Sequence, residues 1–232
     1  MTTQYAPRAN PILITGANRG LGLSVAKSLS RLGQSTVLIG RNKDSLHQAI
    51  VDNEITKSKE IVFDLSKDSA ASLDRHLGEC GPISGMIHCA SMFGGSLTKS
   101  DLAELEGWGR LFSNTLMLSK ACLTLMKGQG GRMVFVGSVA GSAGRVSEDY
   151  GPYSVYKGSL RLLAEAVTKE GLGHRVTASY LNLGSFRKDD VALEKPARFI
   201  SESDVVDAIL GLVYTQLDVR IDQVDVLPTD EA

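Results

Sequence analysis

Several features that would point to other protein classes are scarce or absent in this chain of 232 residues. Its 25 lysines and arginines nearly balance its 26 aspartates and glutamates, so it has no electrostatic footprint for nucleic acid or an anionic membrane. No uninterrupted apolar stretch is long enough to span a bilayer, and residues 1–10 lack the apolar core of a signal peptide. We therefore expect neither a nucleic-acid partner nor a membrane partner.

Cysteine and histidine are also scarce. The three cysteines, Cys80, Cys89 and Cys122, are odd in number and widely spaced, which favours a reducing compartment over a disulfide framework. The four histidines are scattered without ligand spacing, and only His88, at the end of an apolar run, is a candidate for a specific role. The sequence thus predicts a cytoplasmic protein without a metal site.

Helical and strand patterns alternate along the whole chain, which predicts an α/β fold: a doubly wound parallel sheet of the Rossmann type, with helices on both faces. Seven strands are expected at Ile12–Thr15, Thr36–Ile39, Glu60–Phe63, Ile83–His88, Arg132–Val136, Val176–Tyr180 and Asp222–Leu227. Helices are expected at about 20–32, 42–52, 68–78, 107–127, 153–171 and 202–215. Right-handed crossovers favour the strand order 3-2-1-4-5-6-7. We expect a flexible N-terminal arm, residues 1–10, and a single domain, residues 11–232.

The stretch Thr15-Gly16-Ala17-Asn18-Arg19-Gly20-Leu21-Gly22 joins the first expected strand to the first expected helix. Glycines in such a turn leave room for a pyrophosphate to approach the main chain. The start of the helix then offers unpaired N–H groups and the positive end of its dipole to the anion. The order strand, glycine turn, helix therefore predicts a dinucleotide site, and an ordinary tightly packed strand-turn-helix is the alternative.

A second candidate site follows the fifth expected strand, where Ser138 precedes Tyr153 and Lys157. Residues four apart share one face of a helix, and a nearby ammonium favours the ionised form of a phenol, whose free pKa is about 10. A tyrosine tuned in this way can donate a proton to a carbonyl oxygen or take one from an alcohol, while Ser138 could hold the same oxygen. The alternative is that the tyrosine and lysine lie on a helix surface by chance. Their position after the fifth strand and after Ser138, in a chain that also carries the glycine turn, disfavours it.

With these motifs the chain resembles the short-chain dehydrogenase/reductase family, from about Ile12 to Gly184. Thr15-Gly16-x-x-x-Gly20-x-Gly22 looks like the cofactor turn of that family, and Tyr153-x-x-x-Lys157 looks like its catalytic pair. The resemblance implies four catalytic residues: Tyr153 as general acid/base, Lys157 lowering its pKa and binding the nicotinamide ribose, Ser138 orienting the substrate carbonyl, and Asn114 holding a water in a proton relay. Asp64 and Leu65 match the adenine-contacting pair. The expected cofactor-binding residues are Gly16, Asn18, Arg19, Gly20, Leu21, Gly22, Arg41, Asp64, Leu65, Ala90, Tyr153, Lys157 and Gly184.

Charge after the second expected strand favours NADP(H) over NAD(H). An NAD-specific site usually places a carboxylate there, but this segment has none before Asp44. Arg41 and Arg19 could instead bracket a 2′-phosphate, because guanidinium geometry suits phosphate. Two solvated surface arginines are the alternative.

Two segments depart from the family pattern. His88-Cys89-Ala90-Ser91 stands where the family often has Asn-Asn-Ala-Gly, and Leu183-Gly184 stands where Pro-Gly is common, without the threonine that follows it. These departures keep open a non-catalytic NADP(H)-binding sensor or structural protein. Retention of all four catalytic residue types favours an NADPH-dependent carbonyl reductase, acting in either direction. An epimerase or dehydratase is disfavoured, because the chain lacks the larger substrate domain of those relatives.

The expected partner is a small-molecule carbonyl substrate. The substrate-covering segment, about residues 185–200, is short, which favours an open pocket for a bulky or carrier-bound compound. Arg145, Arg187 and Lys188 could recognise an anionic group, although solvated loop charges are the more common explanation. The helices at 107–127 and 153–171 carry more apolar residues than one buried face needs. The excess suits the contacts of the homodimer or homotetramer that the resemblance implies.

Overall fold

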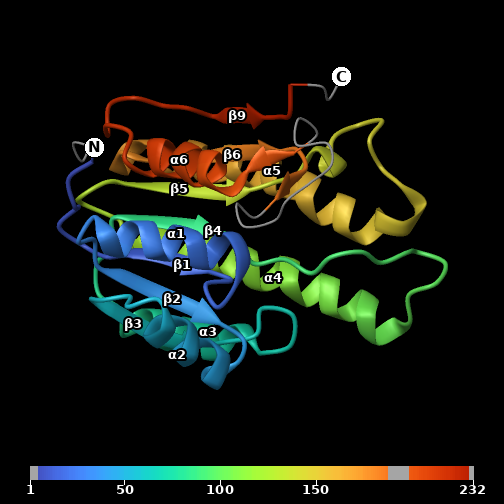
Figure 1. Cartoon of the computed structure of the whole chain (residues 1–232), viewed down its shortest axis with the longest axis horizontal. Helices are drawn as coiled ribbons and strands as arrows, with labels where there is room; N and C mark the ends of the chain where they lie inside the picture. The colour runs from blue at the N-terminus through green and yellow to red at the C-terminus, as the bar shows by residue number, and fades with distance from the viewer. Residues whose placement is uncertain (1–4, 188–198, 230–232) are drawn as a thin grey trace.

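The computed structural model describes residues 5–187 and 199–229 and contains a seven-stranded sheet (Figure 1). The strands are β1 (Ile12–Thr15), β2 (Thr36–Gly40), β3 (Ser58–Val62), β4 (Gly85–His88), β5 (Gly131–Val136), β6 (Val176–Leu183) and β9 (Gln223–Val226). They lie in the order β3-β2-β1-β4-β5-β6-β9, and every pair is parallel. The predicted fold class and strand order are confirmed, with β9 as the seventh strand.

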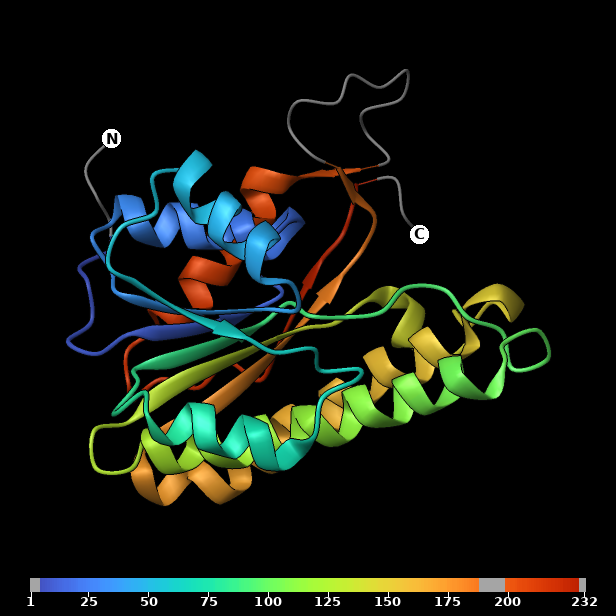
Figure 2. The same ribbon diagram turned by 90° about the horizontal axis from the view of Figure 1, so that it is seen from below.

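Helices cover both faces of this sheet, as Figure 2 shows along its edge. They are α1 (Gly20–Arg31), α2 (Lys43–Asp52), α3 (Ala70–Gly78), α4 (Leu102–Leu125), α5 (Gly151–Gly171) and α6 (Glu202–Val213). Buried side chains of α3, α4 and α5 pack on one face, and those of α1, α2 and α6 pack on the other. Three short 3-10 helices, at Val139–Gly141, Glu148–Tyr150 and Leu172–His174, lie in the connections.

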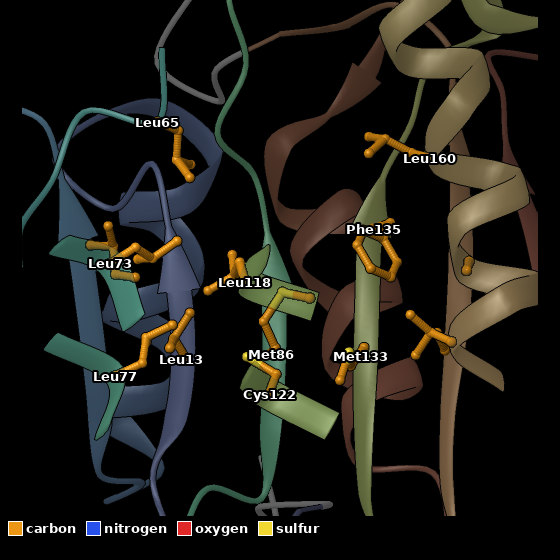
Figure 3. Packing of buried hydrophobic residues seen from close by; sticks show 14 of the residues in the cluster. Leu13, Leu65, Leu73, Leu77, Met86, Leu118, Cys122, Met133, Phe135 and Leu160 are labelled. Atoms are coloured by element: carbon orange, nitrogen blue, oxygen red, sulfur yellow. The ribbon is translucent and has the colours of Figure 1, made fainter. Parts of the chain in front are cut away.

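The core follows from the alternation of strand residues, because successive side chains point to opposite faces of a sheet. Leu13, Met86 and Met133 pack against Leu118 and Leu160 on the side of α4 and α5 (Figure 3). The next residues along the same strands, Ile14, Ile87 and Val134, belong to the cluster on the side of α1 and α6. Strands buried on both faces read as continuous apolar runs, as these do.

The main differences from the sequence predictions are two element boundaries and one additional sheet. Helix α4 begins at Leu102, because the Asp101 side chain accepts a hydrogen bond from the Glu104 backbone N–H (2.8 Å) and caps the helix. Strand β6 continues to Leu183 because it pairs with β9 over Tyr180–Leu183. A separate two-stranded sheet, β7 (Phe186–Arg187) with β8 (Ile200–Ser201), follows β6 and was not expected.

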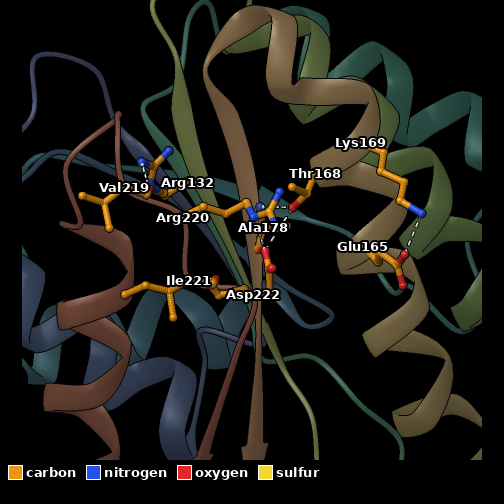
Figure 4. Close-up of polar contacts among 10 residues, drawn as sticks. Arg132, Glu165, Thr168, Lys169, Ala178, Val219, Arg220, Ile221 and Asp222 are labelled. Atoms are coloured by element: carbon orange, nitrogen blue, oxygen red, sulfur yellow. Dashed lines mark hydrogen bonds and ion pairs between the residues drawn. The ribbon is translucent and has the colours of Figure 1, made fainter.

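Polar side chains form hydrogen bonds between the ends of these elements. The Arg132 guanidinium donates to the carbonyls of Gly131 (3.1 Å) and Val219 (2.7 Å), and Thr168 on α5 hydrogen-bonds both backbone groups of Ala178 on β6 (Figure 4). Residues 5–10 are the described part of the expected N-terminal arm, and Arg8 within them makes specific contacts. Arg8 donates to the carbonyls of Val213 (2.9 Å) and Thr215 (3.0 Å) at the end of α6.

Within the described ranges, no helix combines the length and hydropathy needed to cross a membrane.

Candidate active site

The glycine turn after β1 packs closely against neighbouring backbone, with no room for side chains at Gly16 and Gly22. A Cβ on Gly16 would lie 3.0 Å from the Ala90 nitrogen, and one on Gly22 would lie 2.3 Å from the Gly16 oxygen. Helix α1 starts at Gly20, and its N-cap residue, Arg19, makes no side-chain cap hydrogen bond. The turn therefore offers bare backbone and uncapped N–H groups to a ligand, which is the arrangement that a pyrophosphate requires.

This turn opens into a cleft of about 540 Å³ at the carboxyl ends of the central strands. The cleft is lined by every residue of the expected cofactor set: Gly16, Asn18, Arg19, Gly20, Leu21, Gly22, Arg41, Asp64, Leu65, Ala90, Tyr153, Lys157 and Gly184. Ser138 lines it as well. A cleft at the point where strand order reverses, between β1 and β4, is the usual ligand site of such a sheet.

Ser138, Tyr153 and Lys157 meet on one wall of this cleft. Ser138 acts on the Tyr153 hydroxyl, partly opposing the rise in the pKa of the phenol, and its own Oγ accepts from the Ala140 N–H at 3.2 Å. The Lys157 Nζ lies 5.7 Å from the centre of the Tyr153 ring and donates to the Val136 carbonyl at 2.7 Å. A carbonyl oxygen that reached this wall would meet a phenol and an alcohol together, with an ammonium close behind them.

Backbone packing holds this wall in place. A Cβ on Gly141 would lie 2.5 Å from the Gly158 nitrogen, so the turn after Ser138 touches the backbone of α5 directly. Tyr180 on β6 adds a second support: its hydroxyl accepts from the Ser138 N–H and donates to the Ser138 carbonyl, both at 3.3 Å. Sequence reasoning missed both supports, although the glycine that faces this turn, Gly158, is visible in the sequence directly after the Tyr153-x-x-x-Lys157 motif.

Burial sets the protonation of the two titratable groups on this wall. It lowers the pKa of Lys157 to about 8 and raises the pKa of Tyr153, and the Ser138 hydrogen bond only partly opposes the latter shift. Burial is the larger cause of the Tyr153 shift, and the lowering of its pKa by Lys157 stays a prediction. Desolvation penalises the phenolate, and the ammonium is directed at the Val136 carbonyl.

Asn114 corrects another expectation, because it does not line the cleft. It is buried, and its amide nitrogen donates to the carbonyls of Leu65 (2.9 Å) and Asp68 (3.0 Å). The cleft-lining residue of this part of α4 is Leu111, one turn earlier. Asn114 thus fixes the turn that carries Asp64 and Leu65, and both of its amide hydrogens are occupied there.

A chain of hydrogen bonds runs behind the cleft through His88, which is fully buried. Its Nδ1 lies 2.9 Å from Thr15 Oγ1, and its Nε2 lies 2.6 Å from the Tyr156 hydroxyl. Thr15 Oγ1 accepts from the Ala90 N–H (3.1 Å), and the Tyr156 hydroxyl lies 3.1 Å from Thr115 Oγ1. Burial, with the Lys157 ammonium as the smaller cause, lowers the pKa of His88 to about 3, so the ring is neutral.

The charges that bear on ligand choice are distributed unevenly. Arg19 and Arg41 are exposed cleft residues, and neither has an ion pair in the part of the chain that the structure describes. Asp64 is the one carboxylate among the described lining residues. Arg145 does not line the cleft, Arg187 lies in β7, and Lys188 lies outside the described residues.

Comparison with known proteins gives consistent matches. A family model described as short chain dehydrogenase matches residues 10–196. The chain is 29% identical to gluconate 5-dehydrogenase of Gluconobacter oxydans (strain 621H), over 84% of this chain and 76% of that protein. It is also 29% identical to 3-ketodihydrosphingosine reductase of Bos taurus, over 84% of this chain and 63% of that protein.

Solved structures share the fold. A putative betaketoacyl-ACP reductase superposes with a TM-score of 0.82 at 22% identity, covering 95% of this chain and 97% of that one. A metagenomic short-chain oxidoreductase in complex with NADP superposes with a TM-score of 0.78 at 22% identity, covering 95% and 98% of the two chains. At this level of identity, the likeness concerns the arrangement of strands and helices.

Proposed function

This chain belongs to the short chain dehydrogenase family, and we propose that it is an NADP(H)-dependent oxidoreductase that interconverts a ketone and an alcohol. The observation that carries the proposal is the meeting of Ser138, Tyr153 and Lys157 on one wall of the cleft that the glycine turn opens. An acid, a hydrogen-bond donor and an ammonium at one point are what carbonyl reduction requires of a protein.

The residues of the cleft fit a dinucleotide phosphate. Gly16 and Gly22 pack against neighbouring backbone with no room for a Cβ, which holds the turn in place, whereas a Cβ on Gly20 would meet nothing within 4 Å. The start of α1 offers uncapped N–H groups to the pyrophosphate. Arg19 and Arg41 would hold a 2′-phosphate, since both are exposed cleft residues without a carboxylate partner among the described residues. When bound, the nicotinamide supplies or accepts the hydride.

The side chains of this protein would then manage the oxygen and its proton. Ser138 donates a hydrogen bond to the substrate carbonyl, which orients it beside Tyr153. Tyr153 gives its phenolic proton to that oxygen during reduction, or takes a proton from the alcohol during oxidation. Lys157, held at the Val136 carbonyl, favours the phenolate that forms when the proton leaves. Asn114 is left out of this scheme, because its amide is bound to Leu65 and Asp68.

Tyr153→Phe tests the assigned acid. We expect the loss of the hydroxyl to lower the rate of ketone reduction by about 10²- to 10⁴-fold, the usual contribution of a general acid, while the Kd for NADPH changes little. Steady-state NADPH oxidation and fluorescence titration measure the two quantities. Tyr214→Phe is the matched control, because it removes a hydroxyl that bonds Gln34 (3.2 Å) away from the cleft lining. Unchanged turnover in Tyr153→Phe would refute the assignment.

A non-catalytic NADP(H)-binding protein is the second candidate, and one observation favours it. Leu111 presents an alkyl group to the cleft where the proposed reaction would be served by a polar relay residue. Tight NADPH binding together with no oxidation of NADPH across a broad panel of ketones, diketones and acyl thioesters would establish this second candidate. Turnover of any of these compounds that Tyr153→Phe abolishes would exclude it.

A further inference from the structure

An aromatic wall, formed by Phe93, Trp108 and Tyr150, surrounds the ring of Tyr153. The Phe93 ring lies edge-on to Tyr153, with 5.2 Å between centroids and 68° between planes, and it lies 5.2 Å from Tyr150. Trp108 lies 6.4 Å from Tyr153. These residues come from the loop after β4, from α4 and from the segment before α5, which meet at one end of the molecule (Figure 2).

The outer part of this wall is exposed. Phe93 is 76% exposed and Tyr150 is 36% exposed, whereas Trp108 behind them is only 6% exposed. Leu97, in the same loop as Phe93, is 70% exposed and lies at the start of α5, where a Cβ on Gly151 would be 3.5 Å from its Cγ. Large apolar side chains clustered in the open beside a cleft are typical of a ligand-binding surface.

The adjoining part of the cleft is apolar as well. Met92, next to Phe93, lines it together with Leu111 and Phe186. In the neighbouring loops, Lys99 and Asp149 form an ion pair at 3.0 Å, and Arg145 does not line the cleft. The polar atoms of the wall are the Tyr150 hydroxyl and the buried Trp108 Nε1, and the rest of its surface is apolar.

We infer that the substrate of the proposed reaction is a carbonyl compound with a large apolar substituent, which packs on Phe93 and Tyr150. The inference rests on the proposed function, because the wall is placed for a substrate only if Tyr153 handles the reacting oxygen. The carbonyl lies at the Tyr153 and Ser138 hydroxyl groups, and the substituent extends past the Phe93 ring toward Leu97. The wall selects for apolar area and against hydroxylated or charged groups at the same position.

A homologous series of ketones measures this selection. Reduction of the 2-alkanones from butanone to octanone should show kcat/KM rising by about two- to fourfold per methylene, the factor expected for burial of about 0.8 kcal/mol or somewhat less per group. Dihydroxyacetone should be the poorest substrate. In Phe93→Ala the factor per methylene should fall below about twofold. Leu172→Ala is the control, because it removes an apolar side chain that is 49% exposed and lies outside the cleft lining.

A binding series separates this inference from the proposed function. N-alkylacetamides resemble the ketones but are not reduced, and calorimetry on the NADPH-loaded protein gives their affinities. Affinity that rises with chain length in the parent and not in Phe93→Ala supports the wall even if no ketone is reduced, in which case only the proposed function fails. Ketone reduction that is independent of chain length, or fastest with dihydroxyacetone, overturns the wall and leaves the proposed function standing. A change of oligomeric state in Phe93→Ala with an unchanged slope also overturns it, because the ring would then contact a second copy of the chain.

Discussion

Arg41 and Arg19 carry the choice of cofactor at the scale of single residues. Both guanidinium groups are exposed at the cleft, and the only described carboxylate in the lining, Asp64, belongs to the turn after β3. A guanidinium can hold a phosphate by two parallel hydrogen bonds, whereas it gains little from a ribose hydroxyl. The cofactor that carries the additional phosphate is therefore the one that these two residues favour.

Arg41→Ala should weaken NADPH binding by about 10- to 100-fold, the value of one or two charge-assisted hydrogen bonds, and leave NADH binding nearly unchanged. Titration of both cofactors gives the two dissociation constants. Arg31→Ala, at the end of α1 and outside the cleft lining, is the matched control. Equal weakening of both cofactors would mean that Arg41 contacts a group that they share.

The residue scale also shows where the sequence was sufficient and where it was not. The glycine turn, Ser138, Tyr153 and Lys157 could be placed at one cleft, because parallel strands end at a common edge. Asn114 could not be placed there, because its match rested on residue type alone and took no account of the face of the helix on which the residue lies. Leu111 and Asn114 are three residues apart, which on a helix is a rotation of about 300° and a rise of about 4.5 Å. The cap at Asp101, with Glu104 three residues later, was the available signal for the start of this helix.

At the scale of elements, the His88 chain joins β1, β4, α4 and α5, and its hydrogens can be assigned. Thr115 donates to the Leu111 carbonyl (2.7 Å), so the Tyr156 hydroxyl must donate to Thr115 and accept from His88 Nε2–H. His88 Nδ1 is then the acceptor for Thr15, whose oxygen accepts from Ala90. Every group in the chain donates and accepts in one direction, from the cleft-lining Ala90 to the backbone of Leu111.

This arrangement predicts a loss of stability in mild acid. A histidine has a pKa of about 6.5 when unfolded and, at this site, about 3 when folded, so the unfolded chain binds more protons between these values. The contribution of neutral His88 is fully present above pH 6.5 and is lost as the pH falls, by about 2 kcal/mol at pH 5 relative to pH 7. Urea unfolding at the two pH values measures it. In His88→Asn the difference between pH 7 and pH 5 should shrink by about this amount, and an unchanged difference would contradict the assignment.

At the scale of the whole molecule, α4 and α5 lie side by side on the outer face of the helical layer (Figure 2). Phe112 and Leu116 share one face of α4, and Val155 and Leu162 share one face of α5, and all four are exposed. Apolar rows on two adjacent helices are the usual material of a two-fold interface, and we propose that the protein is a homo-oligomer through this surface.

Leu162→Arg should therefore lower the oligomeric state, because Leu162 is 63% exposed here and an arginine between two copies would bury an unpaired charge. Sedimentation velocity measures the mass, and NADPH titration checks that the fold persists. Val51→Arg, at a 55% exposed position on α2, is the matched control and should change neither quantity. A parent protein that sediments as a monomer would rule out this surface as a stable interface.

The direct backbone contact of Gly141 with Gly158 has a consequence for how this scaffold can be altered. It fixes the backbone that follows Ser138 against the backbone of α5, through a contact that does not involve Phe93 or Tyr150. The loops that bear these two residues can accordingly be exchanged, lengthened or redesigned while the proton-handling groups keep their spacing. Recognition and reactivity are thus modular in this protein, and a library confined to residues 93–98 and 142–150 should alter selectivity far more often than it destroys turnover.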